Sequence, residues 1–542
     1  MVCGRAGIIR RLLSLLLFLV GGNSLFFNQA SAQFLTNQAI EDEVYARLSQ
    51  QPIPCTIVIF GATGDLTARK LLPALYNLAY EGNLSEQTAI IGFARKEHTN
   101  QSFRKLMGEA VDQFSRAKPK EELFWQDFQE RLFYHQADLE QDEGYANLQK
   151  LLQQIDKERG VPGNRLYYLA TSPRYFTTII KKIQEHGLLY EPDGQEKWSR
   201  IIFEKPFGTD LESAFQLQQN LLRYLDESQV YLIDHYLGKE GVQNLFTLRF
   251  ESGLLEPMWN AEYIDHVQIT LSEEIGIGSR AHFWEETGAL RDIFQNHLMQ
   301  LIAIVAMEPP RFLCSDHIHA EKIKLLNAIR PFTLEEMEHS VIRGQYGPGI
   351  IRGENVPGYK QEADVSETST AETFMAAKLF IDNPRWQGVP FYIRGGKRLA
   401  KQTTEIAIIF KKKASLKEQA SNALFIRIQP NPGIFLRTLS KVPTLVKQVR
   451  AILFGYCPDA YFKARSPEAY EKLIYDCING DNSLYTQAEE HLAAWRLLTP
   501  ILDYWKSSTD SEIPQYEAGS WGPPIVDRLL NQQGHEWQLL EN

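Results

Sequence analysis

The sequence predicts a parallel α/β domain followed by a larger α+β domain that is built on a mainly antiparallel sheet. In the first part, short apolar runs alternate with helical patterns up to residue 233, which is typical of strands joined by crossover helices. From residue 265 on, the apolar runs follow one another with few helices between the later ones, as in antiparallel sheets with one covered face. We therefore expect one domain at 52–233 and a second at 234–542.

The composition is that of an ordinary globular protein, since 44% of the 542 residues are hydrophobic and 23% are charged. A formal net charge of -10 argues against a protein that binds nucleic acid through its phosphates. The 5 cysteines show neither a C-x-x-C pair nor metal-ligand spacing, so we expect isolated thiols in the reducing cytoplasm. The 12 histidines form no metal-ligand pattern either, and we predict no required metal.

The amino terminus points to a different compartment. Arg5, Arg10 and Arg11 precede an apolar run at 12–20, and the small residues 30–32 resemble a cleavage site, so residues 1–32 have the form of a secretory signal peptide. The alternative is a gene start placed too far upstream, or a lineage-specific extension. No later run reaches the roughly 18 apolar residues that cross a bilayer, so we expect no stable membrane association.

A glycine-containing turn lies between the first predicted strand, at residues 55–60, and a helix expected from Asp65 to Leu78. The turn reads Gly61-Ala62-Thr63-Gly64-Asp65-Leu66. Its glycines let the backbone approach a pyrophosphate, and the helix N-terminus points N–H groups at it. A strand, a turn and a helix in this order predict a Rossmann-like dinucleotide-binding domain. The alternative is a tight structural turn, because the full G-x-G-x-x-G pattern is absent.

Two cations follow the second predicted strand, at residues 88–93. Arg95 and Lys96 stand where an enzyme for unphosphorylated cofactor usually has an acidic residue, so they favour the 2′-phosphate of NADP. A pair of solvated surface residues is the alternative.

Between about 100 and 160 the pattern is helical, with Leu132 on an apolar helix face, and the glycine-containing segment 344–366 is expected to be a flexible surface loop.

Two further strands end in clusters of reactive side chains. The run at 200–203 leads into Glu204-Lys205-Pro206-Phe207-Gly208, and the run at 230–233 leads into Asp234-His235-Tyr236-Leu237-Gly238-Lys239. The carboxyl ends of parallel strands form the ligand-binding edge of an α/β sheet, so both clusters are expected in one cleft. Pro206 restricts the backbone beside Lys205, and we predict a cis peptide bond there.

Together with Arg291-Asp292-Ile293-Phe294-Gln295-Asn296-His297, these motifs give the chain a resemblance to the glucose-6-phosphate 1-dehydrogenase family. The motifs occur in the order and spacing of that family, and the resemblance runs from about residue 52 to the carboxyl terminus. It implies oxidation of D-glucose 6-phosphate at C1 to 6-phospho-D-glucono-1,5-lactone with hydride transfer to NADP+, the first step of the oxidative pentose phosphate pathway. It also implies a homodimer or homotetramer that contacts through the second-domain sheet.

The resemblance assigns a role to each candidate residue. His297 is the general base, Asp234 orients its imidazole, and Lys205 reaches substrate and nicotinamide together. The implied substrate-binding residues are His235, Tyr236 and Lys239 for the phosphate, and Glu273, Asp292, Lys397 and Lys401 for the sugar. The implied cofactor-binding residues are Gly61, Ala62, Thr63, Gly64, Asp65, Leu66, Arg95 and Lys205.

Two other functions stay open at this point. A dehydrogenase of the Gfo/Idh/MocA kind also carries Glu-Lys-Pro after a dinucleotide fold and would prefer an unphosphorylated sugar. An exported, non-catalytic homologue is suggested only by residues 1–32. The cluster of His235, Tyr236 and Lys239 argues against the first, because an uncharged sugar needs no such set of cations and donors.

Overall fold

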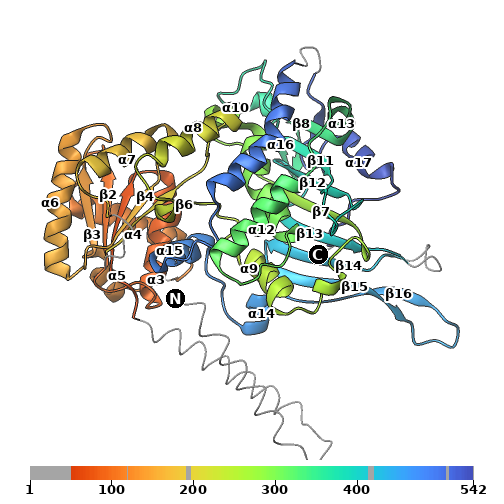
Figure 1. Ribbon diagram of the computed structural model, residues 1–542, viewed down its shortest axis with the longest axis horizontal. Helices are drawn as coiled ribbons and strands as arrows, with labels where there is room; N and C mark the ends of the chain where they lie inside the picture. The colour runs from red at the N-terminus through yellow and green to blue at the C-terminus, as the bar shows by residue number, and fades with distance from the viewer. Residues whose placement is uncertain (1–50, 119, 191–196, 413–419, 508–511, 541–542) are drawn as a thin grey trace, which may run out of the picture.

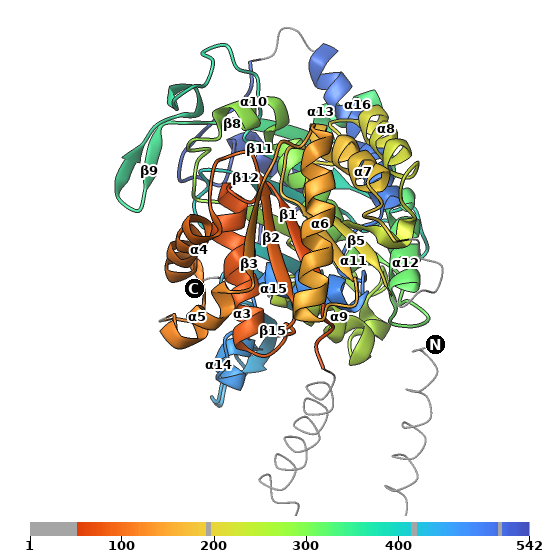
Figure 2. The same cartoon turned by 90° about the vertical axis from the view of Figure 1, so that its left-hand side faces the viewer.

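The computed structural model describes residues 51–118, 120–190, 197–412, 420–507 and 512–540 (Figure 1). The signal-like segment 1–32 lies outside these residues. No helix in the described part of the chain is long and apolar enough to cross a membrane. Figure 1 shows two sheets side by side, each with its own helices, and in Figure 2 the first sheet lies in front.

The first sheet is parallel throughout, with strand order β3-β2-β1-β4-β5-β6. Its strands are β1 (Thr56–Phe60), β2 (Ala89–Ala94), β3 (Leu132–Gln136), β4 (Arg165–Leu169), β5 (Ser199–Phe203) and β6 (Val230–Leu232). Strand order reverses between β1 and β4, the kind of switch point at which doubly wound sheets bind ligands. This confirms the predicted Rossmann-like architecture.

Apolar side chains along the central strands point alternately to the two faces of this sheet, and a layer of helices packs on each face. Ile57 and Ile59 of β1 pack with one layer, whereas Val58 and Phe60 pack with the other. The first layer holds η1 (a π-helix, Thr67–Leu71), α3 (Leu72–Tyr80), α4 (Asn100–Phe114) and α5 (Glu122–Gln129). The second holds α6 (Asp142–Arg159) and α7 (Phe176–Glu185), with η2 (Pro173–Tyr175), α8 (Leu211–Leu221) and η3 (Glu227–Gln229) nearby (Figure 2).

Leu132 corrects one expectation, because it begins strand β3 and not a helix face. It pairs with Ile90 of β2 at the edge of the sheet, and the other β3 residues are only partly buried. A short edge strand without apolar alternation resembles the helical segments on either side of it. Its sequence therefore gave no separate strand signal.

The second sheet has nine strands in the order β16-β15-β14-β13-β7-β12-β11-β8-β17. They are β7 (Ile264–Ser272), β8 (Val341–Gly347), β11 (Phe374–Leu379), β12 (Phe391–Gly396), β13 (Thr403–Phe410), β14 (Ala423–Gln429), β15 (Gly433–Lys441), β16 (Val449–Tyr456) and β17 (Gln515–Glu517). Only the β7–β12 and β8–β17 pairs are parallel, so the sheet is mixed and mostly antiparallel, as predicted.

The segment 344–366 contains short strands, where a loop was expected, although much of it lies at the surface as predicted. It completes β8 and continues into β9 (Gly349–Ile351), β10 (Glu354–Val356) and the single turn η7 (Tyr359–Gln361). Tyr346 and Tyr359 are buried here with their rings 5.7 Å apart. The glycines suggested a loop, but the buried tyrosines hold the segment against the domain.

The helices of the second half cover the sheet and also reach the first domain. They are α9 (Glu240–Phe246), η4 (Thr247–Glu251), η5 (Glu256–Met258), α10 (Ala281–Ala289), η6 (a π-helix, Leu290–Leu298), α11 (Met299–Ala306), α12 (Ser315–Ala328), α13 (Leu334–Ser340), α14 (Pro458–Phe462), α15 (Ala469–Asn479), α16 (Ala488–Ser507), η9 (Pro524–Asp527) and α17 (Arg528–Asn531). Helix η6 packs on β7, β11 and β12, whereas α15 packs on α3 and α16 packs on α8.

Candidate active site

Strands β5 and β6 end side by side and place Lys205 and Asp234 at one sheet edge. The Ile233 amide donates to the Phe203 carbonyl at 3.1 Å, so the chain stays paired until just before Asp234. The Lys205–Pro206 peptide bond is cis, which confirms the prediction. Two reactive groups that are 29 residues apart in sequence thus lie at the same edge of the sheet.

Helix η6 brings His297 and Asp292 to the same place. The His297 Nδ1 lies 2.5 Å from Asp234 Oδ1, and its Nε2 lies 2.9 Å from the Lys205 ammonium. Lys205 also donates to Asp292 Oδ1 and to its backbone carbonyl, both at 3.0 Å. A hydrogen-bonded chain therefore runs from Asp234 through His297 and Lys205 to Asp292.

The charges of this chain prepare His297 to accept a proton. Burial lowers the pKa of His297, the Asp234 carboxylate opposes that shift, and Lys205 adds to it, so the pKa lies below that of an ordinary histidine. Burial alone would raise the pKa of Asp234, but His297 and Lys205 hold it well below its usual range. A neutral imidazole that donates from Nδ1 to Asp234 keeps a lone pair on Nε2, where Lys205 now donates.

Lys239 and His235 line a cavity of about 300 Å³ next to this hydrogen-bonded chain. The Lys239 ammonium donates to Gln429 Oε1 at 2.5 Å, and burial lowers the pKa of Lys239 to about 8. The Tyr236 hydroxyl lies 3.2 Å from Thr404 Oγ1 and accepts from Gln429 Nε2 at 3.0 Å. Burial, with nearby His297 and Lys239, lowers the pKa of His235 well below the ordinary value, so this imidazole is a neutral donor.

The carboxylates predicted for the sugar lie on the other side of Lys205. The Lys397 ammonium is buried, pairs with the Glu273 carboxylate and lies 4.8 Å from the centre of the Trp284 ring. Burial would raise the pKa of Asp292, but Lys205 and Lys397 bring that pKa down to about 2. Both carboxylates can act as hydrogen-bond acceptors, and each is paired with a lysine.

Lys401 is directed elsewhere. Its ammonium donates to the Leu540 carbonyl at 3.2 Å, beside a separate cavity that Arg352 and Arg427 also line. The structure thus brings together every predicted catalytic and substrate-binding side chain except this one.

Family models for the two domains of glucose-6-phosphate dehydrogenase match nearly all of the described chain. The model of the NAD-binding domain matches residues 58–244, and the model of the C-terminal domain matches residues 246–538. The chain belongs to the glucose-6-phosphate dehydrogenase family. This is a family of oxidoreductases, and the fold and the motif resemblance both agree with that membership.

Relatives and solved structures of the family match over most of their length. Glucose-6-phosphate 1-dehydrogenase of Chlamydia pneumoniae is 50% identical over 497 residues, which is 90% of this chain and 96% of the relative. Glucose-6-phosphate 1-dehydrogenase 2 of Mycobacterium tuberculosis H37Rv is 41% identical over 506 residues, 92% of this chain and 97% of the relative. A glucose-6-phosphate dehydrogenase solved in complex with its substrate glucose-6-phosphate superposes with a TM-score of 0.82 at 35% identity, covering 91% of this chain and 100% of that one. The Mycobacterium avium enzyme gives 0.74 at 32% identity, covering 90% and 99%.

The glycine turn after β1 is a tight turn that requires glycine at position 61. Gly61 has a φ of +88°, and a Cβ there would lie 2.3 Å from the Ala170 carbonyl oxygen. The Gly64 amide donates to the Gly61 carbonyl at 2.9 Å, and helical structure begins at Asp65. Gly64 and Asp65 are exposed, so the helix N-terminus is open to a ligand. Arg95 is also exposed, just beyond β2 and next to this turn in the sheet.

Three contributors to the cleft were missed from the sequence. Lys70 of η1 lines the cavity with Lys239 and pairs with Glu468 at 2.8 Å. Gln429 ends β14 and reaches Lys239, and Tyr470 of α15 stacks on the His235 ring at 6.2 Å. Lys70 lies on the predicted cofactor helix and gave a weak signal. The other two come from segments at least 190 residues away in sequence, so no local pattern could place them.

Proposed function

We propose that this protein oxidises D-glucose 6-phosphate at C1 to 6-phospho-D-glucono-1,5-lactone, with NADP+ as hydride acceptor. This reaction is the first step of the oxidative pentose phosphate pathway. The supporting observation is the hydrogen-bonded chain Asp234–His297–Lys205 beside a cavity with two lysines. Bound NADP+ would supply the hydride acceptor, held by the Gly61–Leu66 turn, Arg95 and Lys205.

The Asp234–His297 pair, called the dyad below, is suited to removing the proton of the C1 hydroxyl. For this step the substrate hydroxyl takes the place that the Lys205 ammonium holds at His297 Nε2. His297 then accepts the proton, and the imidazolium is stabilised by Asp234 at Nδ1. Lys205 remains beside the reacting oxygen as a hydrogen-bond donor. Asp234 thus fixes both the orientation and the tautomer of the base.

The remaining groups would hold the substrate at its two ends. Lys239, His235 and Tyr236, with Lys70 nearby, offer positive charge and donors to a phosphate dianion. The acceptors for sugar hydroxyls are Glu273 and Asp292, with Lys397 as a donor. Lys401 stays a prediction of the sequence.

We propose the domain division at residue 233/234, with cofactor binding before it and substrate binding after it.

Initial rates followed at 340 nm test this function. NADPH should form with glucose 6-phosphate and NADP+, much faster than with unphosphorylated glucose at equal concentration. Faster oxidation of the unphosphorylated sugar would select the alternative sugar dehydrogenase, and no reduction with either would reject the enzyme assignment.

We expect Arg95→Ala to weaken the preference for NADP+ over NAD+. A guanidinium that binds the 2′-phosphate contributes about 1.5–3 kcal/mol, so KM for NADP+ should rise about tenfold or more while KM for NAD+ changes little. The two KM values are measured with saturating glucose 6-phosphate, and Arg223→Ala, another exposed arginine of this domain, is the control. An equal rise in both KM values would contradict the assignment.

We expect Lys239→Ala to raise KM for glucose 6-phosphate about ten- to a hundredfold, with a smaller change in kcat. The pKa of Lys239 is lowered to about 8, so the wild-type ammonium loses its proton, and KM rises, as the pH passes above about 8. The variant has no ammonium to lose, so this alkaline rise should disappear. Lys472→Ala, which removes a lysine paired with Asp476, is the control. A pH-independent wild-type KM between 7 and 9 would contradict this role.

We propose that the β15–β16 side of the second sheet is the oligomer contact. Leu453 is 51% exposed and Phe454 is 58% exposed on β16, and Tyr461 and Phe462 of α14 are exposed beside them. Sedimentation velocity should give the mass of two or four chains for the wild type and of one chain for Phe454→Asp. Ile350→Asp changes an equally exposed residue on β9 and should leave the mass unchanged. A monomeric wild type would reject the proposal.

A further inference from the structure

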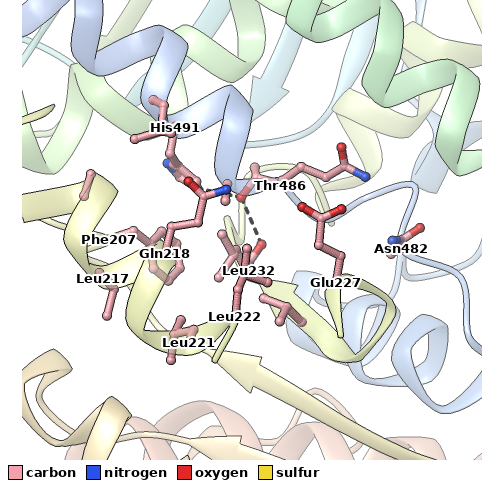
Figure 3. A pocket seen from close by; sticks show the side chains of 15 residues that line it. Phe207, Leu217, Gln218, Leu221, Leu222, Glu227, Leu232, Asn482, Thr486 and His491 are labelled. Atoms are coloured by element: carbon pink, nitrogen blue, oxygen red, sulfur yellow. Dashed lines mark hydrogen bonds between the residues drawn. The ribbon is translucent and has the colours of Figure 1, made fainter. Parts of the chain in front are cut away.

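Helix α16 begins with two buried polar residues that the reaction itself does not use. Glu490 is 0% exposed and His491 is 3% exposed. Glu490 accepts from Gln300 at 2.9 Å and pairs with His319 and Lys322, which bring its pKa down to about 2 despite its burial. These contacts fix the first turn of α16 against α12 and α11. His491 then faces the other way, toward the first domain (Figure 3).

Both nitrogens of the His491 ring are hydrogen-bonded. Nε2 lies 2.7 Å from Thr486 Oγ1, and Nδ1 lies 3.1 Å from Gln295 Nε2. The Thr486 hydroxyl donates to the Leu232 carbonyl at 3.1 Å, and the Thr486 amide donates to the same oxygen at 3.0 Å. Since the hydroxyl proton is used on Leu232, His491 donates from Nε2 and accepts at Nδ1 from the Gln295 amide. One neutral tautomer therefore satisfies the whole network, and burial lowers the pKa of His491 to about 4.

The network around His491 meets the chain two residues away from each of Asp234, His297 and Lys205. Leu232 lies two residues before Asp234, and Gln295 lies two residues before His297. The His491 ring also packs on Phe207, with ring centres 4.7 Å apart, and Phe207 lies two residues after Lys205. Trp495 of the same helix donates to the Phe207 carbonyl at 3.3 Å. His491 thus contacts two of the three segments that carry the hydrogen-bonded chain directly, and reaches the third through Thr486.

We propose that His491 is a positioning residue, whose neutral imidazole, through Thr486 and Gln295, fixes the separation of Asp234 and His297. The proposal rests on the role of His297 given under Proposed function. The Asp234–His297 contact is short and buried, and such a contact weakens steeply when one side moves. The backbone on both sides of the dyad is held from one point, so losing that point should lengthen the contact.

Replacing His491 with leucine removes both hydrogen bonds and keeps an apolar side chain against Phe207. We expect kcat to fall about tenfold, with KM for glucose 6-phosphate within about twofold of the wild type. Asp234 raises the pKa of His297, so a weaker Asp234–His297 contact should lower that pKa. The acidic limb of the pH profile, where kcat/KM falls because His297 is protonated, should then move to lower pH by about half a unit. Thr486→Val breaks the same path with little change in volume, and should shift the limb in the same direction. His491→Gln keeps one donor and one acceptor and should restore most of the loss.

Leu498→Ala serves as a matched control, since it opens a buried site on α16 without a polar contact. It should lower the melting temperature and leave the acidic limb of kcat/KM unchanged. A second readout does not need activity: the downfield proton resonance of the Asp234–His297 bond, identified by its loss in His297→Asn, should move upfield in His491→Leu. An unchanged resonance and an unchanged limb in both His491→Leu and Thr486→Val would overturn the proposal. A shifted resonance in a chain that does not oxidise glucose 6-phosphate would reject the proposed function alone.

Discussion

Replacing His297 with asparagine is expected to lower kcat for glucose 6-phosphate oxidation by about 10²–10⁴-fold. Asparagine retains a polar group near Asp234 but supplies no basic nitrogen where Nε2 now lies 2.9 Å from Lys205. In the proposed binding mode the substrate phosphate is held elsewhere, by the group around Lys239, so KM should change only a few-fold. Michaelis parameters from NADPH formation, measured beside a thermal melt, separate lost chemistry from lost folding.

The pH profile of the wild type gives a second check on His297. The base must be neutral, so kcat/KM should be constant at neutral pH and fall as the pH drops through the pKa of His297. Burial and Lys205 place that pKa below the ordinary histidine value of about 6.5. His186→Asn, a change at a partly exposed histidine paired with Asp142, should reproduce the wild-type profile. Wild-type turnover in His297→Asn, or a limb above that value, would show that another group is the base.

The residues that could be predicted from the sequence are mostly those that directly follow a strand. Lys205 and Asp234 come at the ends of adjacent parallel strands, and the topology of such sheets puts strand ends at one edge. His297 could be assigned only through the family motif, because its place on an apolar helix is equally typical of a core histidine. The structure adds the distances that join these groups into one hydrogen-bonded chain.

Residues that act across long sequence separations could not be found in this way. Gln429 reaches Lys239 across 190 residues, and His491 reaches Gln295 across 196 residues. The outer strands β15 and β16 were missed because the side chains of β15 are mostly only partly buried and those of β16 are largely exposed, so both lack the apolar pattern of a buried strand. Lys401 was assigned to the sugar through the family resemblance; its ammonium donates to the Leu540 carbonyl, and its role stays a prediction.

Replacing Lys205 with methionine is expected to impair binding and turnover together. The ammonium contacts both Asp292 and the base nitrogen of His297, so it lies between the groups proposed for the sugar and those for the proton. Methionine keeps most of the length and removes the charge. Loss of one preorganised donor lowers kcat by about 10²–10³-fold, and loss of a charged hydrogen bond should raise KM for glucose 6-phosphate about tenfold.

The same substitution should move the pH profile in the direction opposite to that expected for His491→Leu. Lys205 lowers the pKa of His297, so its removal raises that pKa and shifts the acidic limb of kcat/KM to higher pH. Lys205→Arg keeps the positive charge and should therefore keep the limb close to the wild-type position, although its larger head group reduces kcat. A change confined to kcat in Lys205→Met, with KM and the limb unchanged, would contradict the shared role. An unchanged limb would mean that the field of Asp234, and not the ammonium beside Nε2, controls the proton affinity of the base, and a shift to lower pH would contradict the assigned effect of Lys205.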